Sequence, residues 1–176
     1  MEISREDLDP WHRALADLAD VRDWNRLWGP DGDVLVLRDR VAAATGWVPM
    51  PPGPVIDDRQ RSWGFDTPRG TVVDVHPQSV LVRLKQAWVA RDVSNEQEFV
   101  EAVGVALPRW DRLVAAGAAV LGEEPSQAEP DLEDTRKLAV WHSPGAEIRL
   151  ACKAPLHYDE ELPGITFALT VEASNR

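Results

Sequence analysis

Residues 138–173 have the sequence LAVWHSPGAEIRLACKAPLHYDEELPGITFALTVEA, in which two runs alternate apolar with mostly polar side chains. Apolar residues occupy every second position of residues 146–152 and again of residues 165–171. This period of two predicts β-strands with one buried face and one solvated face. Together with the apolar residues from 138 onward they predict a meander of three antiparallel strands. Helices from earlier in the chain are the expected cover for its apolar face.

Helices are expected in three places before this meander, two of them within the first 46 residues. Asp9-Pro10 predicts a helix start, with Trp11, Leu15 and Leu18 on its buried side and Asp17 facing water. Residues 33–45 fit either a strand or a helix; we favour a helix over at least the second half, ended by Gly46.

A longer helical region follows at residues 94–122. Ser94 and Gln97 have the spacing of a capping box, Pro108 interrupts the pattern, and Gly122 ends it. Trp110, Leu113 and Gly117 belong to the apolar stripe of its second half. The region is therefore either a helical hairpin or one helix kinked at the proline.

The remaining segments predict further strands and two connectors. A strand is expected at residues 62–66, and a hairpin at residues 70–75 and 79–89 around His76-Pro77-Gln78. A proline-rich connector lies near residues 48–56, and an acidic loop near residues 123–135. The predicted fold class is α+β: an antiparallel sheet of two meander or hairpin units, covered by helices on one face.

Composition points to a soluble cytoplasmic protein. The 176 residues, 44% hydrophobic and 28% charged, fit one domain spanning residues 1–176. The one cysteine, Cys152, lies on the apolar side of a predicted strand and cannot form an internal disulfide. The chain opens with no signal-peptide pattern and has no apolar run of membrane-spanning length. Most of the eight tryptophans are expected in the core.

The net charge of −11 limits the choice of partner. A field of that sign repels a nucleic-acid backbone and favours a basic protein partner. The alternative is that the charge only keeps the protein soluble.

Catalytic patterns are scarce. Asp74 and His76 are two residues apart, so on a strand they share a face and could orient a base or hold a metal, but no third ligand is evident. His142 and Ser143 are adjacent and point apart. The chain has no phosphate-binding loop, dinucleotide fingerprint, HExxH, paired CxxC or GxSxG motif. The sequence therefore predicts no catalytic residues, no metal and no cofactor.

The loop expected at residues 155–164 is dense in acidic side chains and holds the only tyrosine of the sequence, Tyr158. It could be an acid–base site, a solvated loop, or the contact for a basic protein, where charge steers the encounter and the ring adds buried area. We take the last as the candidate binding surface, and nearby acidic residues could extend it. Its predicted residues are Asp131, Glu133, Asp134, His157, Tyr158, Asp159, Glu160 and Glu161.

Several short motifs resemble a known group of proteins. They are Asp23-Trp24, residues 43–47 (AATGW), residues 120–125 (VLGEEP), Val140-Trp141 and the strand at residues 146–153. In their order they resemble small actinobacterial proteins encoded beside secreted polymorphic toxins, families that look like immunity proteins. The resemblance implies binding, with no catalytic residues to transfer.

Three hypotheses follow. The first is an immunity protein that binds a secreted toxin domain in the cytoplasm and blocks its active site. The second is a secretion chaperone or adaptor, which would bind an extended export substrate, often as a dimer. The third is an enzyme with an unrecognised site around Asp74 and His76.

Overall fold

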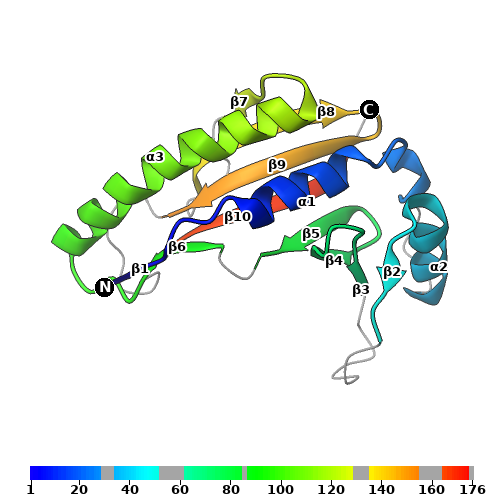
Figure 1. Cartoon of the computed structure of the whole chain (residues 1–176), viewed down its shortest axis with the longest axis horizontal. Coiled ribbons are helices and arrows are strands. Elements are labelled where there is room, and N and C mark those ends of the chain that lie inside the picture. The colour runs from blue at the N-terminus through cyan, green and yellow to red at the C-terminus, as the bar shows by residue number, and fades with distance from the viewer. Residues whose placement is uncertain (29–33, 52–61, 85–86, 129–134, 155–163, 175–176) are drawn as a thin grey trace.

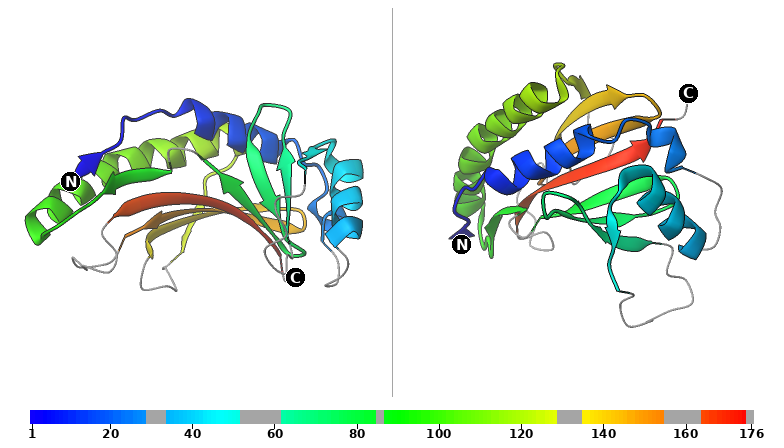
Figure 2. Two further views of the ribbon diagram at one scale, coloured as in Figure 1. Left: turned by 90° about the horizontal axis from the view of Figure 1, so that it is seen from below. Right: turned by 45° about the vertical axis from the view of Figure 1, so that its right-hand side comes forward.

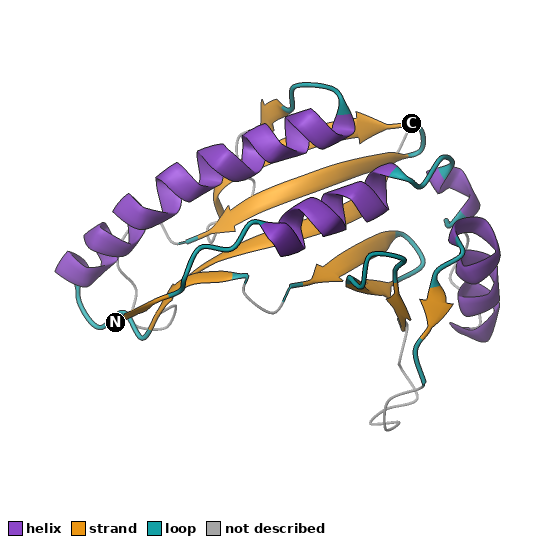
Figure 3. Cartoon of the chain, in the orientation of Figure 1, coloured by secondary structure: helices purple, strands orange, loops and turns teal. Residues whose placement is uncertain are grey.

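The computed structural model describes residues 1–28, 34–51, 62–84, 87–128, 135–154 and 164–174. Figure 1 shows the order of the elements along the chain, and Figure 3 separates helices from strands. The helices are α1 (Asp9–Ala19), the short 3-10 helix η1 (Trp24–Arg26), α2 (Val34–Thr45) and α3 (Glu96–Leu121). The strands are β1 (Glu2–Ile3), β2 (Val48–Pro49), β3 (Trp63–Asp66), β4 (Val72–Val75), β5 (Ser79–Arg83), β6 (Trp88–Arg91), β7 (Ser126–Ala128), β8 (Thr135–Ser143), β9 (Ala146–Lys153) and β10 (Ile165–Ala173).

The ten described strands join one antiparallel sheet, of which eight have the order β2-β3-β4-β5-β10-β9-β8-β7. The other two lie off this path: β6 pairs with β10, and β1 pairs with β6. The first meander is β3-β4-β5 and the second is β8-β9-β10. Strand β10 links them, because it pairs with β9 along one edge and with β5 and β6 along the other. The predicted α+β class and the antiparallel sheet of two meander units are therefore confirmed.

The alternation in the second meander matches its burial. Ile148, Leu150 and Cys152 of β9 are buried, as are Phe167 and Leu169 of β10, while the residues between them are half-buried. The period of two thus separates an inner face, on which the core forms, from an outer face.

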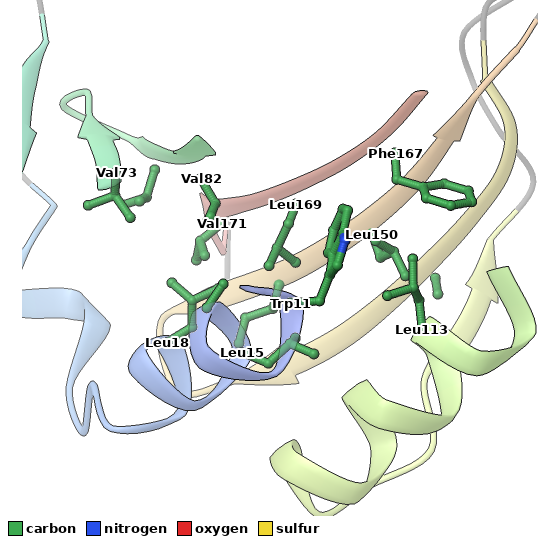
Figure 4. Close-up of a cluster of buried hydrophobic side chains, with 14 of the residues drawn as sticks. Trp11, Leu15, Leu18, Val73, Val82, Leu113, Leu150, Phe167, Leu169 and Val171 are labelled. Atoms are coloured by element: carbon green, nitrogen blue, oxygen red, sulfur yellow. The ribbon is translucent and has the colours of Figure 1, made fainter. Parts of the chain in front are cut away.

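Helices α1 and α3 lie on the same side of the sheet (Figures 1 and 2). Trp11 of α1 and Trp110 of α3 both contact the ring of Phe167 in β10, with ring centroids 6.1 Å and 6.2 Å apart. Figure 4 shows side chains of α1 and α3 meeting those of the sheet in one cluster, which includes Leu15, Leu18, Leu113, Leu150, Leu169 and Val171. Five tryptophans are buried, as expected for most of them: Trp11, Trp24, Trp47, Trp110 and Trp141.

Helix α3 settles the choice between a hairpin and a single helix. It runs for 26 residues without interruption, with Pro108 inside it and exposed. A proline on the outer side of a helix lets the helix bend over the sheet beneath it. The cap lies one residue later than predicted: Asn95 accepts from the Glu98 N–H, and the Glu98 carboxylate accepts from Ser94. Gly122 ends the helix with φ of +80°, as expected.

Three further predictions need correction. The arm expected as one strand at residues 79–89 is two strands, β5 and β6, which pair with different parts of β10. The acidic segment at residues 123–135 contains β7, which pairs with β8. Asp17 is 1% exposed and does not face water, because the β3–β4 turn packs against it. By contrast, the helix favoured over at least the second half of residues 33–45 is confirmed, because α2 spans Val34–Thr45.

In the proline-rich connector predicted near residues 48–56, Val48–Pro49 form β2, and residues 52–56 lie outside the described chain. Among the described residues, no helix combines the length and the apolar character needed to cross a membrane.

Candidate binding surface

All eight predicted binding residues lie outside the described residues, in segments 129–134 and 155–163. The described strands nevertheless fix where these segments leave the sheet. Lys153 near the end of β9 is the direct partner of Thr135 at the start of β8 and of Thr166 at the start of β10. Both segments therefore join the sheet at the same end, which we call the acidic end.

The described residues at the acidic end include three basic ones. Lys137 lies 4.0 Å from Asp111 of α3, and Arg136 stacks over the ring of Phe99 with 5.7 Å to its centroid. Lys153 closes this group on β9. Four acidic residues fall in segment 129–134 and three in segment 155–163. The carboxylates thus outnumber the three cations from which the segments depart.

The outer face of the second meander is not covered by α1 or α3. In Figure 2 these two helices lie on the other side of the sheet. Leu138, Ala151 and Ala168 are neighbours across three strands and form a small apolar row on this face. At the end opposite the acidic end, Arg149 pairs with Glu147 and with Glu172, each at 2.8 Å. The charges of this face are therefore largely paired with one another.

Asp74 has a structural partner. Its carboxylate accepts two hydrogen bonds from the guanidinium of Arg83 on the adjacent strand, one of them at 2.6 Å, and this contact raises the pKa of Arg83. Arg83 lies opposite Val72, hence diagonal to Asp74, a reach that long side chains span. His76 uses its backbone N–H to close the β4–β5 turn on the Ser79 carbonyl at 2.8 Å. The geometry therefore explains Asp74 without a catalytic role.

The two other described histidines, His12 and His142, do not form a cluster with nucleophiles. His142 is exposed with its Nδ1 3.8 Å from Glu147, while the adjacent Ser143 belongs to the opposite face of β8. His12 is exposed on α1. No group of three His, Cys, Asp or Glu side chains within the described ranges could hold a metal ion.

Cys152 should react with a thiol reagent only when the protein unfolds. Its side chain is 0% exposed, and burial raises its pKa to about 11. A neutral, covered thiol is a poor nucleophile. Labelling with a chromogenic aromatic disulfide should be slow in buffer and fast in urea, and no other cysteine contributes to the signal. Rapid labelling of the native protein would contradict the buried position of β9.

A second surface, at the start of the chain, was not predicted from the sequence. Residues 1–8, which we call the N-terminal strap, lie along β6 and α3 and are bound by Arg91, Arg109 and Arg112. A strand of two residues is too short to show the alternation that predicts strands. The sequence feature that could have indicated this surface is the pair Arg109 and Arg112, three residues apart on one helix face.

Comparison with known proteins gave no match: no family model, no curated protein and no solved structure is similar to this chain. The function of this protein is therefore inferred from its own residues.

Proposed function

We propose that this protein is a cytoplasmic immunity protein that binds a basic toxin domain through its acidic end and blocks that domain's active site. The observation that supports the proposal is the strand register at Lys153, through which two acidic segments far apart in sequence leave one end of the sheet. Their charges act together if they face one partner.

A surface of this kind suits an inhibitor of an enzyme that acts on anions. Carboxylates accelerate the encounter with a basic domain and occupy the path of an anionic substrate such as nucleic acid or a dinucleotide. Tyr158, placed among these carboxylates in the sequence, would supply the buried aromatic contact that charge alone does not provide.

The first experiment is a pull-down from the native host, followed by calorimetry with the partner, preferably the product of the adjacent gene. The proposal expects a one-to-one complex with a folded basic domain, of nanomolar strength and weakened by salt. An unfolded export substrate as the only partner would support the chaperone hypothesis instead. Activity lost on His76→Ala, with the fold intact, would support an enzyme.

A charge-reversal variant tests which surface binds. Changing Asp159, Glu160 and Glu161 to lysine should slow association with the toxin domain by about tenfold or more at low salt, since six units of charge change at the contact. Stopped-flow fluorescence at two salt concentrations measures the rate.

The matched control reverses three exposed carboxylates elsewhere, Asp39, Asp66 and Glu124. They lie on α2, β3 and just beyond the end of α3, away from the acidic end (Figure 1). This control changes the net charge equally, so it should slow association much less. Equal slowing by both variants would mean that net charge alone acts, and would remove the acidic end from the proposal.

A further inference from the structure

The N-terminal strap forms an edge strand of the sheet. Glu2 pairs with Arg91 and Ile3 with Ala90 in an antiparallel ladder, and the Ser4 N–H donates to the Val89 carbonyl at 2.9 Å. Figure 1 shows this strand beside β6, before the chain turns into α1. Main-chain hydrogen bonds of this type do not depend on sequence, so any extended segment could replace them.

Three arginines bind the strap. Arg91 bonds Glu2 at 2.6 Å, and Arg112 bonds both oxygens of Glu6 at 2.7 Å and 2.6 Å. Arg109 donates to the hydroxyl of Ser4 at 2.9 Å and to its carbonyl at 2.7 Å. Arg112 also lowers the pKa of Glu6, so Glu6 is charged at neutral pH. In a chain of net charge −11, this is a local basic surface that selects carboxylates.

The floor beneath the strap is apolar. Strap residues Ser4 to Leu8 close over it and leave a cavity of only about 20 Å³, lined also by Trp11, Trp88, Val89, Leu113 and Phe167. Of these five, only Trp88 is more than 5% exposed. The strap offers this floor one large apolar side chain, Leu8, which packs against the core. The floor would therefore favour an occupant with more apolar side chains at the alternate positions.

The ion pairs of the strap are exposed, whereas its contact with Arg109 is largely buried, since the Arg109 side chain is 13% and Ser4 8% exposed. Glu2 and Ile3 are both exposed, Ile3 by 36%. The side chains of the Arg91–Glu2 pair are 54% and 51% exposed, and those of the Arg112–Glu6 pair 49% and 31%. Ion pairs this exposed are screened by water and salt and contribute little. Local opening of the strap should therefore need much less free energy than unfolding of the sheet.

We propose that the edge of β6, its three arginines and the apolar floor form a docking site for an extended acidic segment of a partner protein, which the N-terminal strap occupies in the free molecule. The segment would carry carboxylates at the spacing of Glu2 and Glu6. This proposal does not rest on the immunity function, since a basic toxin domain would be repelled by these arginines. It corresponds to the binding mode of a chaperone or adaptor.

A strap-loosened variant of the full chain tests the site. Glu2→Lys with Glu6→Lys places lysines against Arg91 and Arg112 and should release the strap. The probe is a fluorescein-labelled peptide with the strap sequence MEISREDL, titrated by anisotropy. The loosened variant should bind it about tenfold or more tightly than the wild type does, because the site is no longer occupied. Asp66→Lys with Glu124→Lys, of equal net charge, should bind like the wild type.

A second peptide, with lysine in place of both glutamates, should bind the loosened variant no more tightly than it binds the wild type, because its lysines cannot pair with the arginines. No binding of MEISREDL by a loosened variant with unchanged circular dichroism would overturn the proposal. Dimers of the loosened or wild-type protein in light scattering, with no peptide binding, would assign the site to a second copy of the chain and overturn the assignment to a partner.

Hydrogen exchange of the wild-type protein gives an answer even if the loosened variant fails to fold. The amide of Ser4, which donates to the Val89 carbonyl of β6, should exchange far faster than the amide of Leu150 in β9, a strand that is paired along both edges. Equal protection of the two amides would mean that the strap opens only with global unfolding, and the docking proposal would fall.

Discussion

Replacing Gly117 by alanine is expected to destabilise the protein by about 1–3 kcal/mol, although alanine favours helix more than glycine does. A Cβ atom at position 117 would lie 2.4 Å from Cζ2 and 2.7 Å from Cη2 of Trp141. Trp141 cannot easily move, because it is 1% exposed and its indole N–H donates to the Glu123 carbonyl at 3.2 Å. The close approach of α3 to β8 therefore requires glycine here.

Gly104 of the same helix is the matched control. No atom lies within 4 Å of a Cβ built there, and the residue is exposed. Gly104→Ala should thus stabilise the protein by up to about 1 kcal/mol through helix propensity alone. Urea unfolding followed by tryptophan fluorescence measures both variants. Equal stabilisation by the two substitutions would show that α3 does not pack closely against Trp141 at position 117.

The elements that could be predicted from sequence are those specified by neighbouring residues. The alternation along β9 and β10 and the stop at Gly122 are local patterns, and each matches the structure. Gly117 was placed on the buried stripe by its helical spacing, but its necessity comes from Trp141, which is 24 residues away and on another element. Spacing identifies a face; it does not identify what packs against it.

Non-local contacts account for the features that sequence reasoning missed. The break between β5 and β6 follows from how both pair with β10, more than 70 residues later. The strap is bound by Arg109 and Arg112, about 105 residues further along the chain. The eight predicted binding residues lie outside the described chain and stay a prediction; what the register adds is that their segments share one end of the sheet.

Asp17 is the clearest example of a residue whose role depends on non-local contacts, because an aspartate on an amphipathic helix is ordinarily solvated. Its carboxylate accepts from the Thr67 hydroxyl at 2.5 Å, from the Arg69 backbone N–H at 3.3 Å and from the Arg69 guanidinium at 3.0 Å. All three donors belong to the turn between β3 and β4, and they satisfy a charge that is 1% exposed. Asp17 therefore fastens the first meander to α1.

Asp17→Ala is expected to lower the free energy of unfolding by about 2–3 kcal/mol, since hydrogen bonds to a buried charge are strong and their donors lose their partner. Asp20→Ala is the matched control: Asp20 pairs with the same guanidinium at 2.6 Å but is 67% exposed, so its loss should cost less than about 1 kcal/mol. Urea unfolding measures both.

Combining Asp17→Ala with Thr67→Ala tests the contact itself. If the hydroxyl and the carboxylate stabilise each other, the double variant should lose less than the sum of the two single variants. Additive losses, or equal losses at Asp17 and Asp20, would mean that the turn is held by packing rather than by this carboxylate. A sub-additive result would show that the buried carboxylate of Asp17, which helical periodicity does not reveal, couples α1 to the turn between β3 and β4.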